Sequence, residues 1–302
     1  MIYENIVQLI GKTPIVKLNK MTDEESAQIY LKLENLNPSG SIKDRASLGM
    51  INEMEKSGIL RKNSVIVEPT SGNTGIATAM ICAAKGYEVV LVMPESMSVE
   101  RRRMLSAYGA KLVLTDASKG MKGAIDKANE LVVEKGYIML SQFDNPANTN
   151  SHKISTAIEI LEDIPDLNVF IAGIGTGGTV SGVAEVLKKN IKSIEVIGIE
   201  PKNSAVINGG KAGFHKIQGI GAGFIPKNYN EIFIDKVVEV SDEDAYKTTV
   251  ELAKKEGIFV GISSGAAVHT AISVAKKIGK KKKILALAPD SGNRYLSVDN
   301  LF

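Results

Sequence analysis

The sequence predicts an α/β fold of two three-layer domains, each built on a mostly parallel sheet. The first observation behind this prediction is that short apolar segments alternate with longer amphipathic ones along most of the 302 residues, a pattern typical of βαβ units. The second is that this alternation runs from about residue 63 to residue 142 and then restarts. The third is the length, because single hydrophobic cores stop growing at roughly 250–300 residues.

The first run of the alternation predicts the sheet of a smaller domain, spanning residues 44–144. Its predicted strands are 64–68, 88–93, 111–115 and 137–142. Its predicted helices are 74–85, 99–108 and 121–134. No strand is predicted before residue 64, so the segment 37–45 is expected to precede the first sheet.

The second run predicts a larger domain, formed by residues 1–43 and 145–302, with the boundary near Asp144-Asn145-Pro146. A helix at 152–163 opens this run. The predicted strands are 168–173, 195–200, 236–240 and 283–287. The other predicted helices are 179–188, 242–256 and 265–276, and a glycine-rich loop covers 208–224.

Composition and charge exclude several classes of protein. The net charge is only +3, and the lysine run at 280–283 is interpreted as a solvated helix end, so no nucleic-acid surface is predicted. No stretch reaches the ~20 apolar residues that a membrane helix needs. Residues 1–12 lack the charged-then-apolar plan of a signal peptide. We therefore expect no membrane partner.

The cysteine and histidine content excludes a disulfide and predicts no metal site. Cys82 is the single cysteine; it suits a reducing cytoplasm and, within an apolar segment, is expected to be buried. The histidines show no ligand spacing. They are His152, His215 and His269.

A lysine among small residues is the first candidate for chemistry. Lys43 follows Pro38 and Gly40 in the segment 37–45. If it is held in a pocket, desolvation lowers its pKa and makes it a candidate for Schiff-base formation. Taken alone, this is weak evidence, because most lysines are exposed on protein surfaces and the residue is better interpreted as one of them.

Three polar, glycine-rich loops each follow a predicted apolar strand and open a predicted helix. They are 69–75, 173–179 and 261–265. Ligands in α/β folds bind at the carboxyl ends of strands, so we expect these loops to converge on one cleft between the domains.

The loop at 70–75 offers hydroxyls, an amide and backbone N–H groups at a helix N-terminus, which together suit a carboxylate. The alternative is an ordinary capped turn. The loop at 261–265 carries Ser263 and Ser264, and by itself it predicts only a serine helix cap.

The loop at 173–179 has two functional interpretations. Its glycines allow the backbone to approach an anion, and the helix dipole favours a phosphate. Gly173, Gly175 and Gly178 also match the dinucleotide fingerprint, with Glu200 about 20 residues beyond it, so a nicotinamide-dependent oxidoreductase is the competing class. The neighbouring threonines favour a terminal phosphate, which has more oxygens to satisfy.

Taken together, these motifs resemble the cysteine synthase (O-acetylserine sulfhydrylase) family of fold-type II pyridoxal-phosphate enzymes, whose fold is like that of the tryptophan synthase β chain. The match runs along the whole chain, and the joint order of the motifs disfavours the oxidoreductase. The motifs are IGKTP at 10–14, PSGSIKDR at 38–45, TSGNTG at 70–75, QFDNP at 142–146, GTGGT at 175–179, IQGIGAGF at 217–224, GISSG at 261–265 and RYL at 294–296.

The resemblance implies a role for each part of the site. Lys43 forms the Schiff base with pyridoxal 5′-phosphate (PLP). Asn73 hydrogen-bonds the ring hydroxyl, and Ser263 faces the pyridine nitrogen. The cofactor phosphate is held by Gly175, Thr176, Gly177, Gly178 and Thr179. The substrate carboxylate is received by Thr70, Ser71, Gly72, Thr74 and Gln142.

The resemblance also implies a reaction and its partners. The leading expectation is β-replacement, in which sulfide displaces acetate from O-acetyl-L-serine to give L-cysteine. The alternative uses L-cysteine as donor and releases hydrogen sulfide, as in desulfhydration or in lanthionine or cystathionine formation. Family members are typically homodimers, and similar enzymes bind the C-terminal tail of serine acetyltransferase in the active-site cleft.

Two stretches depart from the family pattern. The Gly-Pro pair usual in the first stretch, 152–160, is replaced by Ala157-Ile158, so the helix there is expected to begin earlier. The second stretch, 211–215, carries Ala212 and Phe214. Both stretches are expected to make substrate-side contacts, and so to bear on the donor and the nucleophile rather than on the cofactor.

Overall fold

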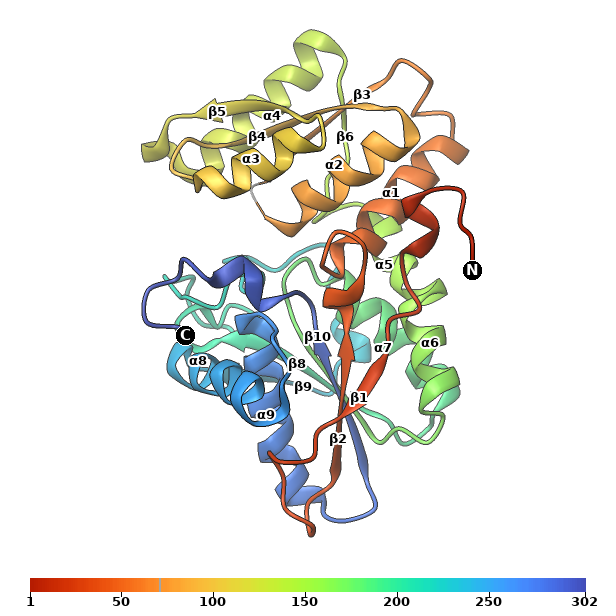
Figure 1. The fold of residues 1–302 in the computed structure, drawn as a ribbon, viewed down its shortest axis with the longest axis vertical. Helices are drawn as coiled ribbons and strands as arrows, with labels where there is room; N and C mark the ends of the chain where they lie inside the picture. Colours follow the sequence, from red (N-terminus) through yellow and green to blue (C-terminus); the bar gives the residue numbers. More distant parts are fainter. Residues whose placement is uncertain (71) are drawn as a thin grey trace.

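Two sheets organise the molecule (Figure 1). The computed structural model describes residues 1–70 and 72–302, with Glu100 described for its backbone only. The four-stranded sheet lies at the top of the view and the six-stranded sheet below it. Nearly all neighbouring strands are parallel, which confirms the predicted α/β fold with parallel-rich sheets.

The six-stranded sheet is built from both ends of the chain. Its strand order is β1 (Ile15–Lys17), β2 (Gln28–Leu33), β10 (Lys283–Ala288), β7 (Val169–Gly173), β8 (Glu195–Pro201) and β9 (Lys236–Val240). The β1 strand is antiparallel to β2, and the other neighbouring pairs are parallel. Ile29 of β2 lies in register with Ile284 of β10, so the two strands join segments more than 250 residues apart.

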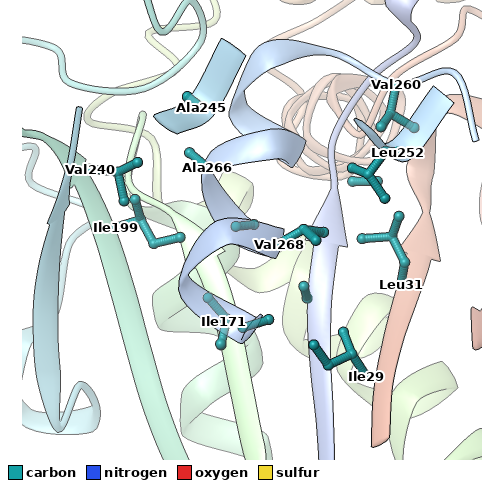
Figure 2. Close-up of a cluster of buried hydrophobic side chains, with 14 of the residues drawn as sticks. Ile29, Leu31, Ile171, Ile199, Val240, Ala245, Leu252, Val260, Ala266 and Val268 are labelled. Atoms are coloured by element: carbon teal, nitrogen blue, oxygen red, sulfur yellow. The ribbon is translucent and has the colours of Figure 1, made fainter. Parts of the chain in front are cut away.

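Alternating side chains bury both faces of this sheet, because successive residues of a strand point to opposite sides. One face, shown in Figure 2, packs Ile171 of β7 and Ile199 of β8 against Ala266 and Val268 of α9 (Ile262–Ile278). On the other face, Phe170 packs with residues of α6 (Thr156–Asp163) and α7 (Gly178–Asn190). The sheet is therefore the middle of three layers.

The four-stranded sheet has the order β5 (Lys111–Thr115), β4 (Glu88–Pro94), β3 (Val65–Pro69) and β6 (Ile138–Met139), all parallel. Ile66 and Leu91 point to one face, which is covered by three helices. Val67 and Val90 point to the other face, against α4 (Gly120–Lys135). The helices of the first face are α1 (Lys43–Lys56), α2 (Asn73–Lys85) and α3 (Val99–Ala107). Cys82 of α2 is fully buried, as predicted.

The first two strands were not predicted, and Lys43 therefore does not precede the first sheet. β1 has only three residues. In β2 the apolar pattern is interrupted by Lys32, which is completely buried and pairs with Glu159 at 2.9 Å. In a sequence pattern, a lysine indicates a surface position. The partner that allows Lys32 to be buried lies 127 residues further along the chain, so the pattern alone could not reveal this strand.

The helix predicted at 152–163 is wrong in its extent. A first helix, α5 (Pro146–Ile154), begins earlier, with Asn145 as its N-cap and a proline at its first turn, which is where a proline favours a helix start. The chain then leaves helical geometry at Ser155, where φ is −128° and ψ is −75°, before α6 begins. α6, the helix that contains Ala157-Ile158, begins only at Thr156, so the earlier start expected from the missing Gly-Pro pair is not found there.

Three other boundaries differ from prediction. The strand expected at 137–142 is shortened to β6, because Ser141 adopts a left-handed conformation with φ of 57°. The helix expected at 242–256 is α8 (Asp242–Glu251) followed by a π-helical turn. No strand precedes Gly261: Val260 forms only an isolated bridge with Ser291. Within the described residues, no helix combines the length and apolar character needed to cross a membrane.

Candidate active site

A cavity of about 700 Å³ collects most of the residues that the sequence singled out. The predicted site residues that line it are Lys43, Thr70, Gly72, Asn73, Thr74, Gln142, Gly175, Thr176, Gly177, Thr179 and Ser263. The expected convergence of three glycine-rich loops on one cleft is therefore confirmed. Gly178 is the first residue of α7 and does not line the cavity. Ser71, predicted to receive the substrate carboxylate, lies outside the described residues.

Three of the helices that open onto this cavity have a glycine as their N-cap. The caps are Gly72 for α2, Gly177 for α7 and Gly261 for α9. The first N–H groups of a helix have no intrahelical acceptor, and a polar cap side chain ordinarily accepts from one of them. A glycine has no such side chain. The N–H groups of all three helices are therefore left to interact with an anion or another polar group in the cavity.

Lys43 begins α1 and points its half-buried side chain into the cavity. Its position is fixed by the chain that follows β10, because the N–H of Ile42 donates to the carbonyl of Pro289 at 2.8 Å. Burial lowers the pKa of the Lys43 ammonium group, and the nearby Asp290 carboxylate partly opposes this shift. The neutral amine, which is the form that acts as nucleophile or base, is thereby favoured.

The loop from β3 to α2 is tied to the chain after β6. The hydroxyl of Thr74 donates a hydrogen bond to Oε1 of Gln142 at 2.6 Å. The N–H groups of Ser141 and Gln142 donate in turn to the Glu68 carboxylate at 3.0 and 3.3 Å. The two parts of the predicted carboxylate-binding site, the loop before α2 and Gln142, are thus held together at the carboxyl edge of the four-stranded sheet.

The N-terminus of α7 is held by two buried side chains behind it. Asn148 of α5 donates to Oγ1 of Thr176 at 3.0 Å. Nε2 of His152 lies 3.1 Å from Oγ1 of Thr179. Burial, with the cations Arg45 and Lys43, keeps the pKa of His152 well below its usual range, so its imidazole is neutral. The helix terminus thus has a neutral imidazole behind it and contributes positive potential for an anion.

Close backbone packing explains the glycines of this loop. A Cβ atom on Gly175 would lie 2.4 Å from the carbonyl oxygen of Gly219, and one on Gly177 would lie 2.6 Å from the backbone nitrogen of Tyr229. Gly177 also has φ of +80°, a region that residues with side chains rarely adopt. Because its glycines have no side chains, the loop backbone can be approached closely by an anion, as phosphate binding requires.

Ser263 is the second residue of α9 and is not its cap, so the simple helix-cap interpretation of this serine is wrong. Its side chain is buried at the cavity wall. Its hydroxyl makes no hydrogen bond with another described residue and is available to a ligand. Ser264, the other candidate, is fully buried and does not line the cavity.

Two buried acidic residues of the cavity wall, Glu68 and Asp290, were missed by the sequence analysis. Asp290 accepts hydrogen bonds from Nδ2 of Asn73 and from the Tyr295 hydroxyl, each at 2.6 Å. Burial raises its pKa. Glu68 is the last residue but one of β3, and burial raises its pKa to about 7. Each lies at the carboxyl end of a predicted strand, which is the signal that could have identified them.

The two stretches that depart from the family pattern lie behind the cavity, so the expectation of direct substrate-side contacts is wrong. Neither 152–160 nor 211–215 contributes to its lining. His152 contacts the cavity residue Thr179, and Nε2 of His215 lies 3.0 Å from the carbonyl oxygen of Gly221. Phe214 is 84% exposed.

The carboxylates and histidines of the described residues form no group of three or more that could hold a metal ion. The donors of the cavity are instead backbone N–H groups, hydroxyls, amides and one lysine. This set of hydrogen-bond donors suits an organic ligand that has an anionic group.

Comparison with known proteins gives a consistent result. The family model described as "Pyridoxal-phosphate dependent enzyme" matches residues 6–290. A protein named cysteine synthase from Staphylococcus aureus (strain Mu50 / ATCC 700699) is 51% identical over 296 residues, which cover 97% of this chain and 96% of that protein.

Solved structures agree in fold along nearly the whole chain. The crystal structure of cysteine synthase from Entamoeba histolytica is 41% identical, has a TM-score of 0.95, and covers 99% of this chain and 90% of that one. The structure of a hydrogen sulfide-producing enzyme from Fusobacterium nucleatum is 44% identical, has a TM-score of 0.94, and covers 98% and 99% of the two chains.

Proposed function

We propose a reaction for this chain from one premise: the chain belongs to the pyridoxal-phosphate dependent enzymes, and within them to the cysteine synthases. Its cofactor is PLP. The reaction is replacement of the acetate of O-acetyl-L-serine by sulfide, with L-cysteine and acetate as products. The observation that carries the proposal is the half-buried Lys43 amine, which shares one cavity with three glycine-capped helix N-termini.

The residues of the cavity fit PLP. The glycine-capped N-terminus of α7, with Thr176 and Thr179 at its opening, suits a phosphate. Lys43 offers the amine that the cofactor aldehyde requires, and Asn73 and Ser263 offer polar groups to the ring. Because Gly178 lies in the first turn of α7 without lining the cavity, we assign it a backbone role in the same cradle.

Bound PLP supplies an electron sink that stabilises negative charge at the substrate Cα. The residues of the chain supply the proton transfers. Lys43, with its pKa lowered by burial, removes the α-proton as general base and later returns a proton to Cα. Asp290 lies close enough to influence the Lys43 charge, and it favours the ammonium form that carries the proton between these two steps.

The substrate carboxylate is received by the loop that opens α2. Thr70, Gly72 and Thr74 present hydroxyl and backbone groups there, and the Thr74–Gln142 hydrogen bond orients the Gln142 amide. We assign Ser71 to the same function on the basis of the family motif. These contacts place Cα of the substrate beside Lys43, which is the orientation that proton abstraction needs.

Ser263 sets the electronic character of the ring. A serine hydroxyl is neutral, so it does not stabilise a proton on the pyridine nitrogen as an aspartate would. An unprotonated ring withdraws electrons less strongly, which favours rapid loss of the β-leaving group over transamination. The buried position of Ser263 at the cavity wall, where its hydroxyl bonds no other described residue, supports this assignment.

A second candidate reaction uses L-cysteine as donor and releases hydrogen sulfide, with or without capture by a second thiol. The similarity to the hydrogen sulfide-producing enzyme of F. nucleatum, 44% identical over 98% of this chain, favours it as the alternative. The same lysine, cofactor and carboxylate loop serve either donor.

We also propose that residues 44–144 form a separate domain that closes over the substrate. The four-stranded sheet lies wholly within this range. Contacts across the cleft connect the two parts: Arg101 of α3 donates to Gln218 at 2.9 Å, and the rings of Phe143 and Phe224 lie 5.2 Å apart. Closure excludes water from the site and so limits hydrolysis as a side reaction.

We propose that the protein assembles as a homodimer. We also propose a reducing cytoplasm as its location, which suits a chain whose single cysteine is buried and forms no disulfide. The carboxylate loop of α2 also suits a peptide C-terminus, so we propose that the tail of serine acetyltransferase competes with substrate there. A short peptide ending in isoleucine should raise the apparent KM for O-acetyl-L-serine. If saturating peptide leaves KM unchanged, this partner is rejected.

The reaction is tested by product analysis. The purified enzyme with PLP is given O-acetyl-L-serine and sulfide, or L-cysteine alone, and cysteine, acetate and hydrogen sulfide are measured. A kcat/KM at least about tenfold higher for the first pair supports cysteine synthesis. A higher kcat/KM for cysteine alone would assign the sulfide-releasing reaction instead.

A further inference from the structure

A buried carboxylate, Asp290, lies in the wall of the active-site cavity, and no step proposed above acts through its direct contacts. It follows β10, where an isolated bridge joins it to Ser41, and it is 2% exposed. Its Oδ2 accepts two hydrogen bonds of 2.6 Å, from Asn73 and from Tyr295. Burying a carboxylate costs free energy unless the group is paired and hydrogen-bonded. The two short contacts therefore suggest that Asp290 has a specific role.

The contact with Asn73 fixes which end of that amide faces the cavity wall. Oδ2 of Asp290 accepts a hydrogen bond from Nδ2 of Asn73, so the amide directs its nitrogen, which is its donor end, toward Asp290. The NH2 group has two hydrogens, and the Nδ2–Oδ2 contact at 2.6 Å uses one of them. The second N–H is then held in the same plane, on a side chain that lines the cavity.

We propose that Asp290 is a positioning residue, which holds the amide of Asn73 so that its second N–H donates to the ring oxygen of bound PLP. This inference rests on the cofactor site described above and deepens it, since it explains how an uncharged side chain is held in a single orientation. Asp290 acts through Asn73 and needs no contact of its own with the cofactor.

The surroundings of Asp290 hold its carboxyl group in place. A Cβ atom on Gly261 would lie 2.0 Å from Oδ1 of Asp290, so the carboxylate is packed directly against the glycine cap of α9. Burial raises the pKa of Asp290, whereas Tyr295, Asn73, Arg294 and Lys43 lower it. The hydroxyl of Tyr295 stays protonated, because its own pKa lies well above the usual range, and it therefore donates.

The test is the affinity of the apo-protein for PLP, measured by equilibrium dialysis. Asp290→Ala removes the acceptor and should raise the Kd for PLP about tenfold, the size expected for one lost hydrogen bond to a charged group. Asp290→Asn keeps an acceptor oxygen and should restore most of the affinity. The visible absorption band of bound PLP should shift in Asp290→Ala, because the ring oxygen loses its oriented donor.

A double-mutant cycle separates positioning from a structural effect. Asn73→Ala should weaken PLP binding by a similar factor, and Asp290→Ala should add little in the Asn73→Ala background. Tyr295→Phe is the matched control: it removes the other hydrogen bond to the same oxygen and should change the Kd by less than about twofold. If Asp290→Ala does not fold, Asp290→Ser replaces it in the cycle.

The outcomes are distinguishable. Unchanged PLP affinity in Asp290→Ala, or losses that add fully in the double variant, would overturn the role of Asp290 while leaving the cofactor site intact. Unchanged affinity in Asn73→Ala would remove the assigned role of Asn73 and the inference with it. A wild-type protein that binds no PLP would reject the proposed function itself.

Discussion

The two loops that would receive anions differ in how tightly they are packed. At the opening of α7, a Cβ atom on Gly175 would meet a backbone oxygen at 2.4 Å, and buried Asn148 and His152 hold both threonines from behind. At the opening of α2, a Cβ atom on Gly72 would meet nothing within 4 Å. The first loop is locked into its surroundings, whereas the second has free space beside its cap.

This difference matches the two proposed ligands. A cofactor stays bound through every turnover, so its phosphate is best held by a backbone that cannot rearrange. A substrate must enter and leave, so its carboxylate is best held by a loop with room to adjust. The comparison can be tested by variants that alter one loop and spare the other.

The largest effect is expected from Lys43→Ala, since Lys43 lines the same cavity as both loops and is proposed to act on both ligands. Activity should fall at least about 10³-fold, the scale of a lost general base, and borohydride should no longer fix the cofactor to the protein. Lys56→Ala, at the exposed opposite end of α1, is the control and should retain activity. Borohydride labelling that persists in Lys43→Ala would assign the amine to another lysine.

The next largest effect should separate the loops directly. Gly175→Ala forces a Cβ atom into the carbonyl of Gly219, and overpacking of this kind costs about 1–3 kcal/mol. PLP affinity should fall by up to about 100-fold. Gly72→Ala should change PLP affinity by less than about twofold, because its Cβ has free space. Equilibrium dialysis of both apo-proteins measures this, and equal losses would contradict the comparison.

Glu68→Gln tests how pH affects the loop tied to the four-stranded sheet. The folded-state pKa of Glu68, about 7, is raised from 4.5 by burial, so the folded state binds the proton more tightly than the unfolded state. Its contribution to stability is complete below pH 4.5 and is lost as pH rises to about 7. The free energy of unfolding of the wild type, relative to Glu68→Gln, should therefore fall by about 3 kcal/mol over that range.

Urea unfolding at pH 4.5 and at pH 7.5 measures this difference. A constant gap between the two proteins would mean that Glu68 has an ordinary carboxyl pKa and that its hydrogen bonds to the N–H groups of Ser141 and Gln142 offset its burial.

The smallest effect is expected from Thr74→Val. This change removes the hydrogen bond to Gln142 and should raise the KM for the amino-acid substrate about tenfold, while PLP affinity stays unchanged. Thr78→Val, one turn further along α2, is the matched control, because its hydroxyl bonds Ser47 and does not line the cavity. Steady-state kinetics with both variants would refute the assignment if their KM values rise equally.

The sequence predicted most strands of both sheets, because apolar strand segments there alternate regularly with amphipathic helix segments. Strand β5, for example, was predicted at its observed boundaries. It did not predict β2, where Lys32 is buried by a partner 127 residues away. Likewise it placed Asn73 and Lys43 in the site by their local motifs, but not Asp290, whose function depends on contacts that form only when three distant segments meet.

The pairing of β2 with β10 also constrains when the protein can become functional during its synthesis. Strands β3 to β6 occupy a continuous stretch, 65–139, so the four-stranded sheet can form while the ribosome is still translating the remainder. Residues 28–33 must wait with an unpaired edge until residues 283–288 emerge. Lys43 and Asp290 meet only through that late closure, so a nascent chain gains its cofactor pocket last, and truncated products lack it.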